Sequence, residues 1–166
     1  MNDSFYEQLV ARRSGTKNIV IHIAIIAAIA LFLILTTPLL GFFSVIITIL
    51  LAFGAYYFVF LKLNVEYEYT LLNYDMEIDV IYSRSKRKKL LSFDIRQAEI
   101  MAPKDSPRLN SYHPEKTLDF SSGDSAAKIF AVMTPVNQKN TRILLEPDKK
   151  MLEQMKSWMG TRFCID

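Results

Sequence analysis

Residues 19–61 read IVIHIAIIAAIALFLILTTPLLGFFSVIITILLAFGAYYFVFL, and this stretch decides the fold. It carries no acidic or basic side chain other than His22. One unbroken helix of this length would be about twice as long as the hydrocarbon core of a bilayer is thick. Pro38 and Gly41 interrupt the run and favour a turn there. The sequence therefore predicts a two-helix transmembrane hairpin over residues 18–62, with helices over residues 19–37 and 39–61.

Basic side chains flank this hairpin on both sides. Arg12, Arg13 and Lys17 precede it and Lys62 follows it, whereas the turn contains neither Lys nor Arg. Because positively charged flanks remain on the cytoplasmic side, both termini are expected in the cytoplasm. The first apolar run begins too late for a secretory signal peptide, and a second run follows it. We therefore expect a multi-pass protein of the cell membrane.

Small side chains predict where the two helices touch. Ala24, Ala28, Ala52 and Gly54 lie at matching depth on an antiparallel pair of helices, and small residues allow close approach of the backbones. Packing within the hairpin is the first expectation, and a dimer face is the alternative. His22 lies about one turn inside the membrane edge, so it is expected to reach the lipid headgroups.

The segment before the hairpin, residues 1–17, is expected to lie in the cytosol as a short amphipathic helix. Ser4 and Glu7 have the spacing of a capping box. Phe5, Leu9 and their apolar neighbours would face the membrane interface, and Gly15 would end the helix.

From Asn64 onward, the hydrophobic pattern becomes the alternation that is typical of β-strands. Apolar and polar residues alternate over residues 65–70, and the alternation resumes after a turn at Asn73-Tyr74. Pairing the two strands about this turn puts Tyr69 opposite Ile78 and Val65 opposite Tyr82. Further strands are expected at residues 88–93, 97–102, 117–121, 128–134 and 142–146, with a long surface loop at residues 103–116.

The last element is a predicted amphipathic helix over residues 147–159. Pro147 suits a first helical turn, and Met151, Met155 and Met159 follow at helical spacing. Seven strands followed by such a helix is the element order of the pleckstrin-homology (PH) superfold. The predicted fold is therefore an α+β membrane protein, in which the hairpin precedes an antiparallel PH-like β-domain at residues 63–166 and the terminal helix plugs its open end.

Four sequence motifs resemble an uncharacterised family of small bacterial membrane proteins with this organisation. They are FYEQLV at residues 5–10, LNVEYEY at 63–69, SKRKKLL at 85–91 and EIMAP at 99–103. The resemblance spans nearly the whole chain. It implies the hairpin and the PH-like domain, and it implies no activity.

The sharpest candidate site is a basic cluster near the second predicted strand turn. One strand leads away from the bilayer and the next returns, so the cluster is expected near the membrane surface, where each cation could gain about 1 kcal/mol from anionic headgroups. A solvated turn that neutralises nearby carboxylates is the alternative. Phosphoinositide-binding members of the superfold gather basic residues at the loop of the first strand pair. That loop is expected here at residues 73–75 and contains neither Lys nor Arg, so specific binding of inositol phosphates is not expected. The candidate lipid-contact residues are Arg84, Lys86, Arg87, Lys88 and Lys89.

A face of carboxylates accompanies this cluster, with Glu68 expected opposite Asp79. Like charges across a strand pair are unfavourable, so either a bound cation or nearby lysines and solvent must relieve them. Outside this face, His113 and Cys164 have no catalytic partner at a useful spacing. The sequence therefore predicts no catalytic residue, no metal site at known motif spacing and no cofactor. The members of the carboxylate face are Glu66, Glu68, Glu77 and Asp79.

Composition narrows the remaining functions. The formal charge of +3 is small and argues against nucleic-acid binding, and the single cysteine excludes an intrachain disulfide. We expect a non-enzymatic, membrane-anchored interaction module whose partners are the lipid bilayer, anionic phospholipid headgroups and an unidentified protein. The alternative is a small accessory subunit or assembly factor of a transporter or another membrane complex.

Overall fold

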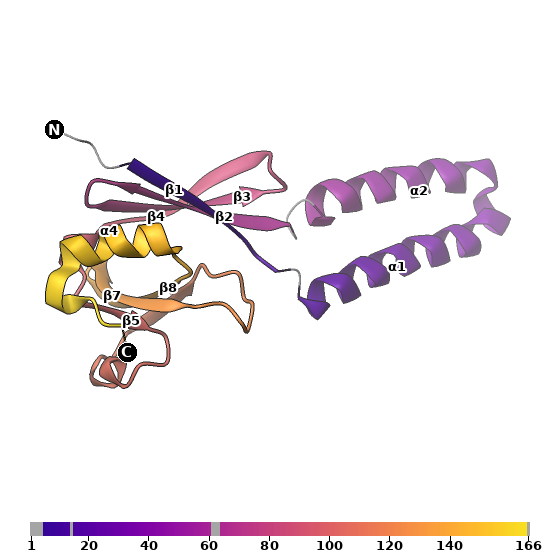
Figure 1. Cartoon of the computed structure of the whole chain (residues 1–166). Helices are drawn as coiled ribbons and strands as arrows, with labels where there is room; N and C mark the ends of the chain where they lie inside the picture. Colours follow the sequence, from indigo (N-terminus) through magenta and orange to yellow (C-terminus); the bar gives the residue numbers. More distant parts are fainter. Residues whose placement is uncertain (1–4, 14, 61–63, 166) are drawn as a thin grey trace. The chain divides into compact units, whose positions relative to one another are not determined.

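The computed structural model describes residues 5–13, 15–60 and 64–165 and divides into two compact units. One unit consists of Ser14–Val65 together with Tyr82–Lys86. The other consists of Met1–Arg13, Glu66–Ile81 and Arg87–Asp166. The first contains the two N-terminal helices and one strand turn, and the second is the β-domain, which includes the C-terminal helix (Figure 1).

The hairpin consists of α1 (Thr16–Leu40), α2 (Phe42–Ala55) and a π-helical turn, η1 (Tyr56–Phe60). The two predicted apolar helices are present, but the break expected at Pro38 is wrong, since Pro38 lies inside α1. The chain reverses at Gly41, whose φ is +54° and whose N–H donates to the Thr37 carbonyl. A proline keeps a helical φ, whereas a reversal with positive φ favours glycine.

The predicted helix-packing residues are not among the buried side chains of the two helices. Ala24, Ala28 and Ala52 are exposed, and Gly54 is only partly buried. Ser44 is fully buried and its Oγ lies 3.3 Å from Thr37 Oγ1. The His22 ring stacks on the Phe60 ring, with the centroids 4.6 Å apart. Polar and aromatic side chains therefore contribute to the contact between the two arms of the hairpin.

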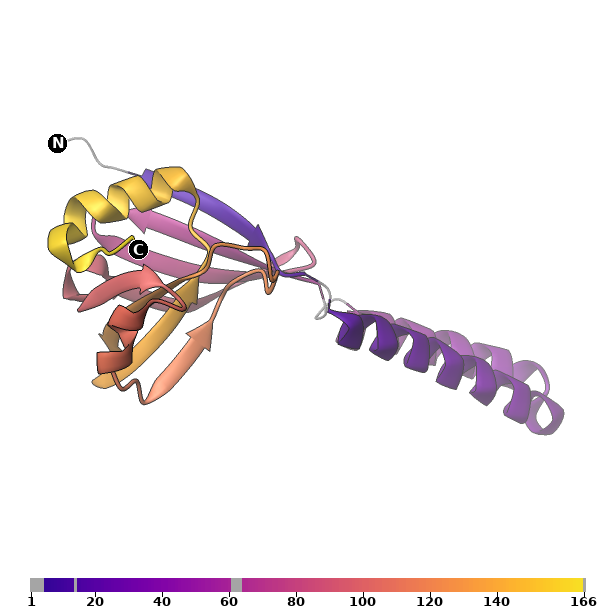
Figure 2. The same cartoon turned by 60° about the horizontal axis from the view of Figure 1, so that its bottom comes forward.

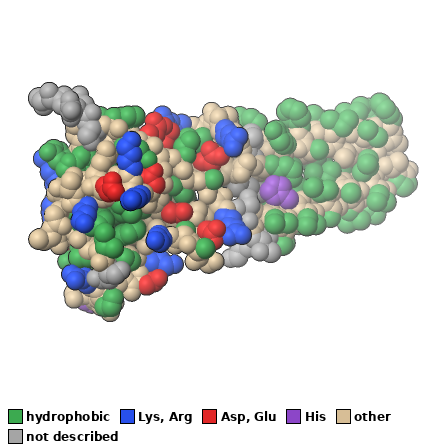
Figure 3. Space-filling view, in the orientation of Figure 1, with side chains coloured by type: hydrophobic (Ala, Val, Ile, Leu, Met, Phe, Trp, Pro, Cys, Tyr) green, Lys and Arg blue, Asp and Glu red, His purple; other side chains and the backbone are tan. Residues whose placement is uncertain are grey.

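Two spans of the hairpin, Asn18–Leu40 and Phe42–Phe60, are long and apolar enough to cross a membrane. None of the residues in the most apolar window of the first span is buried, in contrast to the core helix of a soluble protein. Figure 3 shows the visible face of both helices covered with hydrophobic side chains. This face suits a lipid environment better than water.

The N-terminal segment is a strand, so the predicted helix is wrong. β1 (Phe5–Ala11) pairs antiparallel with β2 (Val65–Leu72), from Phe5 opposite Leu72 to Ala11 opposite Glu66. Its burial alternates with a period of two, and Val10 points inward. Ser4, the expected helix cap, lies outside the described residues. A helix this short is marginal alone, whereas a strand gains a full ladder of hydrogen bonds from β2.

The first sheet has the order β1-β2-β3-β4, with β3 at Asp75–Tyr82 and β4 at Lys86–Asp94. The predicted turn at Asn73-Tyr74 is confirmed, and Asn73 has a φ of +52°. The Ser83 N–H donates to the Asn64 carbonyl at 2.8 Å. This bond extends by one residue the predicted pairing of Val65 with Tyr82.

β4 changes sides partway along its length. Arg87 and Lys89 form ion pairs with carboxylates of the neighbouring strands, whereas Leu91 and Phe93 are buried in the core. All four positions would lie on one side of a regular strand, because side chains alternate strictly. We infer a β-bulge near Leu90, which is 40% exposed.

The second sheet has the order β5-β7-β8-β6 and packs against the first (Figures 1 and 2). β7 and β8 form a hairpin through Asn137 and Gln138, both with positive φ. β6 pairs parallel with β8, a departure from the expected antiparallel domain. The described residues form eight strands. Seven of them follow the hairpin, as predicted, and the eighth is β1. The bounds are β5 (Ile100–Pro103), β6 (Lys116–Asp119), β7 (Phe130–Val136) and β8 (Lys139–Leu145).

Helix α4 (Lys149–Met159) lies along one opening between the sheets, as predicted (Figure 2). It begins two positions later than expected, because Asp148 caps it by accepting a hydrogen bond from the Met151 N–H. Three methionines of α4 are buried, and they extend the domain core. The remaining short turns are η2 (Ile95–Gln97), η3 (Pro107–Ser111) and η4 (Gly160–Arg162).

Candidate functional site

Carboxylates from three strands converge on one arginine on the outer face of the first sheet. Arg87 on β4 forms ion pairs with Glu68 on β2 and with Asp79 on β3, with 3.1 Å between Arg87 Nε and an Asp79 oxygen. Its Nη2 also lies 3.8 Å from a carboxylate oxygen of Glu7 on β1. Glu68 is only 4% exposed, so Arg87 is needed to balance the negative charge of its carboxylate.

Arginine and lysine therefore relieve the repulsion expected between the carboxylates. Lys89 Nζ lies 2.5 Å from Glu77 Oε1, so a second cation of β4 serves the same face. Within residues 5–13, 15–60 and 64–165, no group of three or more His, Cys, Asp or Glu side chains could hold a metal ion. Of the two expected ways of relieving the repulsion, the described structure supports neutralisation by nearby basic side chains.

The predicted basic cluster thus separates into two parts. Arg87 and Lys89 are occupied by carboxylates of their own sheet. Lys86 and Lys88 are exposed, and they form no ion pair with any described residue. Arg84 is exposed in the β3–β4 turn with a φ of +57°. We call Arg84, Lys86 and Lys88 the basic turn.

The first strand pair differs from the one expected. It is β1 with β2, so the loop of the first strand pair spans residues 12–64 and holds the hairpin. Residues 73–75 instead join the second strand pair. Sequence reasoning missed this arrangement because it placed no strand before the hairpin.

Side chains of β1 bind the start of α4. The Tyr6 hydroxyl donates to Asp148, and this hydrogen bond raises the pKa of Tyr6. Gln8 Nε2 donates to the Glu146 carbonyl at 2.8 Å, and Gln8 Oε1 accepts from the Asp148 N–H at 2.8 Å. The Lys150 ammonium lies 4.8 Å from the centroid of the Tyr6 ring. The N-terminal strand is therefore an integral part of the β-domain.

Tyr69 joins the two sheets from inside the core. Its hydroxyl donates to the Phe120 carbonyl at 2.6 Å and accepts from the Glu146 N–H at 3.3 Å. Burial raises the pKa of Tyr69 well above its ordinary value, which keeps the phenol protonated at physiological pH. This residue links β2 to the loops that follow β6 and β8.

An open groove lies between the end of β1 and the loop that follows β6. Its volume is about 530 Å³. Arg13 Nη1 forms an ion pair with Asp124 Oδ1 at 2.9 Å, and the Arg13 N–H donates to the Ser122 carbonyl at 2.8 Å. From the sequence, Arg12 and Arg13 indicated only membrane orientation, and their approach to a loop over a hundred positions away gave no local signal. We call this the β1-end groove, and its lining residues are Ala11, Arg12, Arg13, Ser122, Asp124, Ala126, Ala127 and Glu146.

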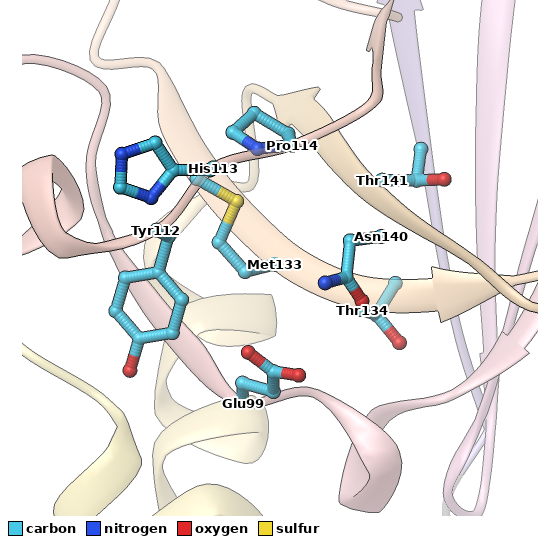
Figure 4. A pocket seen from close by; sticks show the side chains of 8 residues that line it. All are labelled: Glu99, Tyr112, His113, Pro114, Met133, Thr134, Asn140 and Thr141. Carbon is cyan, nitrogen blue, oxygen red and sulfur yellow. The ribbon is translucent and has the colours of Figure 1, made fainter.

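A second, smaller hollow contains one of the two histidines. His113 and Glu99 both line it, from opposite sides in Figure 4, and its volume is about 20 Å³. Such a volume holds about one water molecule. The buried hydroxyl of Thr134 lines it, and no described residue forms a hydrogen bond with this hydroxyl. The hollow is too small for an organic substrate.

Cys164, which the sequence singled out, and Trp158 on α4 lie in packed surroundings. Cys164 is 8% exposed, and Arg108 Nη1 lies 3.5 Å from its sulfur. Trp158 packs edge-on against Tyr74 with the ring centroids 5.2 Å apart, and the Arg96 guanidinium covers the Tyr74 ring. These contacts fix α4 and the C-terminal segment to the sheets.

The comparisons with known proteins agree with this architecture. Residues 2–165 match the family described as Bacterial PH-like domain (DUF6106). Comparison with curated proteins and with solved structures gave no match. The family match covers nearly the whole chain, including the strand before the hairpin and the helix at its end. The chain therefore belongs to this bacterial PH-like domain family.

Proposed function

We propose that this protein is a non-enzymatic, membrane-anchored interaction module. In this proposal, α1 and α2 cross the inner membrane as a hairpin, and both termini lie in the cytoplasm. The PH-like domain is held at the inner leaflet, and the basic turn contacts anionic phospholipid headgroups there.

The observation that carries the proposal is the insertion of the hairpin within a sheet. Ala11 and Glu66 are paired across β1 and β2, and the hairpin is the connection between these strands. A chain that leaves one strand and returns to its neighbour must cross a membrane an even number of times. The topology therefore supports two crossings with both flanks on one side, independently of the charge pattern.

The basic turn supports the lipid contact. Its residues within Tyr82–Lys86 belong to the same compact unit as the helices, and Ser83 is bonded to Asn64, close after the hairpin. Each cation near an anionic leaflet gains about 1 kcal/mol. Arg87 and Lys89 are left out of this contact, because their carboxylate partners lie in the same sheet.

The test uses the full-length chain in vesicles. A fluorophore attached at Ser85→Cys, in a Cys164→Ser background, reports its distance from a quencher carried on lipid headgroups. We expect stronger quenching in vesicles that contain phosphatidylglycerol than in vesicles of phosphatidylcholine alone, and weaker quenching at high salt. The variant Lys86→Ser/Lys88→Ser should remove the difference.

The matched control is Lys149→Ser/Lys156→Ser, which removes two exposed lysines of α4. It leaves the basic turn intact, so the dependence on phosphatidylglycerol should persist. Equal quenching of the parent protein in both kinds of vesicle would contradict the lipid contact.

The alternative role, an accessory subunit or assembly factor of a membrane complex, is favoured by one observation. Ala24 and Ala28 lie one turn apart on α1 and are exposed, so a helix of another protein could approach closely there. Replacing both with leucine should then release a protein that co-purifies from native membranes. The interaction-module proposal expects no such release.

A further inference from the structure

We propose that the β1-end groove binds the headgroup of a zwitterionic phospholipid that carries a phosphate and a primary ammonium group. This inference rests on the proposed function, since it requires the hairpin to lie in the membrane. The groove differs from the basic turn in charge and in location, and its ligand differs accordingly.

The charges that line the groove balance. Arg12 and Arg13 contribute two positive charges, and Asp124 and Glu146 contribute two negative charges. Arg13 and Asp124 form an ion pair with each other, so the guanidinium of Arg12 and the carboxylate of Glu146 are the charges left for a ligand. A purely anionic ligand would meet this carboxylate, and a purely cationic ligand would meet this guanidinium. A ligand that carries both charges is the complementary one.

The arginine wall suits a phosphate. The Arg12 side chain is exposed, and its Nη1 donates to the Tyr67 hydroxyl at 2.9 Å, which fixes the orientation of the guanidinium. Arg13 follows it in sequence, but the Arg13 guanidinium is paired with Asp124, so Arg12 is the donor that the groove offers to a phosphate. Guanidinium groups bind phosphate oxygens through paired N–H donors.

The opposite wall suits a primary ammonium. Glu146 is held in place because its Oε2 accepts from the Ser122 N–H at 3.0 Å. Asp124 is fixed in the same way, since its Oδ1 accepts from the Ala126 N–H at 3.1 Å. Three small side chains also line the groove, namely Ala11, Ala126 and Ala127.

Chain length keeps the groove near the bilayer. Only two residues separate Arg13 from Thr16, where α1 begins. An extended chain covers at most about 3.6 Å per residue, so Arg13 lies within about 11 Å of the start of α1. With the hairpin inserted, this distance matches the headgroup layer and not the bulk cytosol.

The test measures which lipid remains bound to the full-length chain after extraction from vesicles into mild detergent, by native mass spectrometry. The vesicles contain phosphatidylethanolamine or phosphatidylcholine, which share the phosphate but differ in the ammonium. A primary ammonium donates hydrogen bonds to carboxylates and a quaternary one does not. We expect about tenfold greater retention of phosphatidylethanolamine, the ratio for one charge-assisted hydrogen bond.

Variants separate the two walls. Arg12→Gln should lower the retention of both lipids, whereas Glu146→Gln should lower only that of phosphatidylethanolamine, to the level of phosphatidylcholine. Asp124→Asn repeats the carboxylate test should Glu146→Gln fail to fold. The control Lys149→Gln/Glu153→Gln removes one charge of each sign from α4 and should leave retention unchanged.

Three results would overturn the inference: equal retention of the two lipids by the parent chain, unchanged preference in both carboxylate variants, or displacement of the bound lipid by equimolar free phosphoethanolamine. The last would assign the groove to a soluble metabolite. Failure of the proposed function is distinguishable, because the chain would then be recovered in the soluble fraction without detergent. An inserted chain with no preference between the lipids would contradict only the groove assignment.

Discussion

Ala11 and Glu66 lie opposite each other in the antiparallel pair of β1 and β2, although the entire helical hairpin lies between them in the sequence. The β-domain is therefore closed across the hairpin, and β1 belongs to it as fully as the strands that follow. In the sequence, the hairpin is flanked on both sides by neighbouring strands of one sheet.

This pairing predicts that the hairpin can be replaced by a short turn. A chain in which Arg13 is joined to Asn64 through an Asn-Gly linker should fold and remain soluble without detergent. A shorter connection lowers the entropy cost of closing the β1–β2 pair, by about 2 kcal/mol. Circular dichroism and gel filtration measure both properties.

The control for this replacement is a fragment that begins at residue 64 and lacks β1. It loses Tyr6, Gln8 and their bonds to the start of α4, and it exposes the edge of β2. We expect it to unfold at a lower temperature and to aggregate. A stable fragment beside an unfolded linked chain would contradict the role of β1.

Arg87 is expected to stabilise the fold. Arg87→Ala leaves Glu68, which is 4% exposed, without its cation and should cost about 2 kcal/mol, less than a fully buried pair because Arg87 is itself half-exposed. Lys88→Ala, on the same strand, should cost less than about 0.5 kcal/mol. The double variant Arg87→Ala/Glu68→Gln should recover much of the loss. Thermal unfolding of the full chain in detergent measures the differences.

Tyr69→Phe tests the link between the sheets. The substitution removes one donor to Phe120 and one acceptor for the Glu146 N–H without changing the packed ring. Loss of these buried hydrogen bonds should cost about 1–3 kcal/mol. Tyr82→Phe, a substitution of the same kind at a partly buried tyrosine, provides the comparison. Equal stability of Tyr69→Phe and the parent chain would show that the hydroxyl contributes nothing.

Asp94 predicts a pH dependence. The hydrogen bonds from the Arg96 side chain hold the pKa of Asp94 below its ordinary value. A carboxyl with a lowered folded-state pKa stabilises the fold above its ordinary pKa, and this contribution disappears as the pH falls through the lowered value. Asp94→Asn should therefore lower the free energy of unfolding at pH 7 by less than about 1 kcal/mol, and the melting temperature should fall with it. The difference should vanish in strong acid, and a constant difference across the titration would contradict this cause.

Local patterns predicted much of the fold because their causes are local. The alternation around Tyr69 and Ile78 and the turn at Asn73 reflect neighbouring residues, and these elements are confirmed. The helix expected near Phe5 is wrong, because the partner that makes this segment a strand lies beyond the hairpin. Where a short segment fits both a helical and a strand pattern, its pairing with distant residues decides which structure it adopts.

The candidate site shows the same division. The sequence identified the basic cluster, but which of its members face carboxylates depends on the register of β4 and on the bulge near Leu90. The β1-end groove joins Arg12 and Arg13 to Asp124 and Glu146, and their distance in sequence left no pattern to detect. The chain reverses at Gly41 and not at Pro38 because the reversal requires a positive φ, which favours glycine. Composition alone does not show which of the two residues makes the turn.

The most direct test of the central claim is the membrane sidedness of the hairpin turn and the β-domain. In a Cys164→Ser background, Leu39→Cys marks the turn and Lys139→Cys marks an exposed position of β8. A membrane-impermeant maleimide applied to intact spheroplasts should label the first cysteine and should label the second only after permeabilisation. Labelling of Lys139→Cys in intact spheroplasts, with Leu39→Cys protected, would contradict the account.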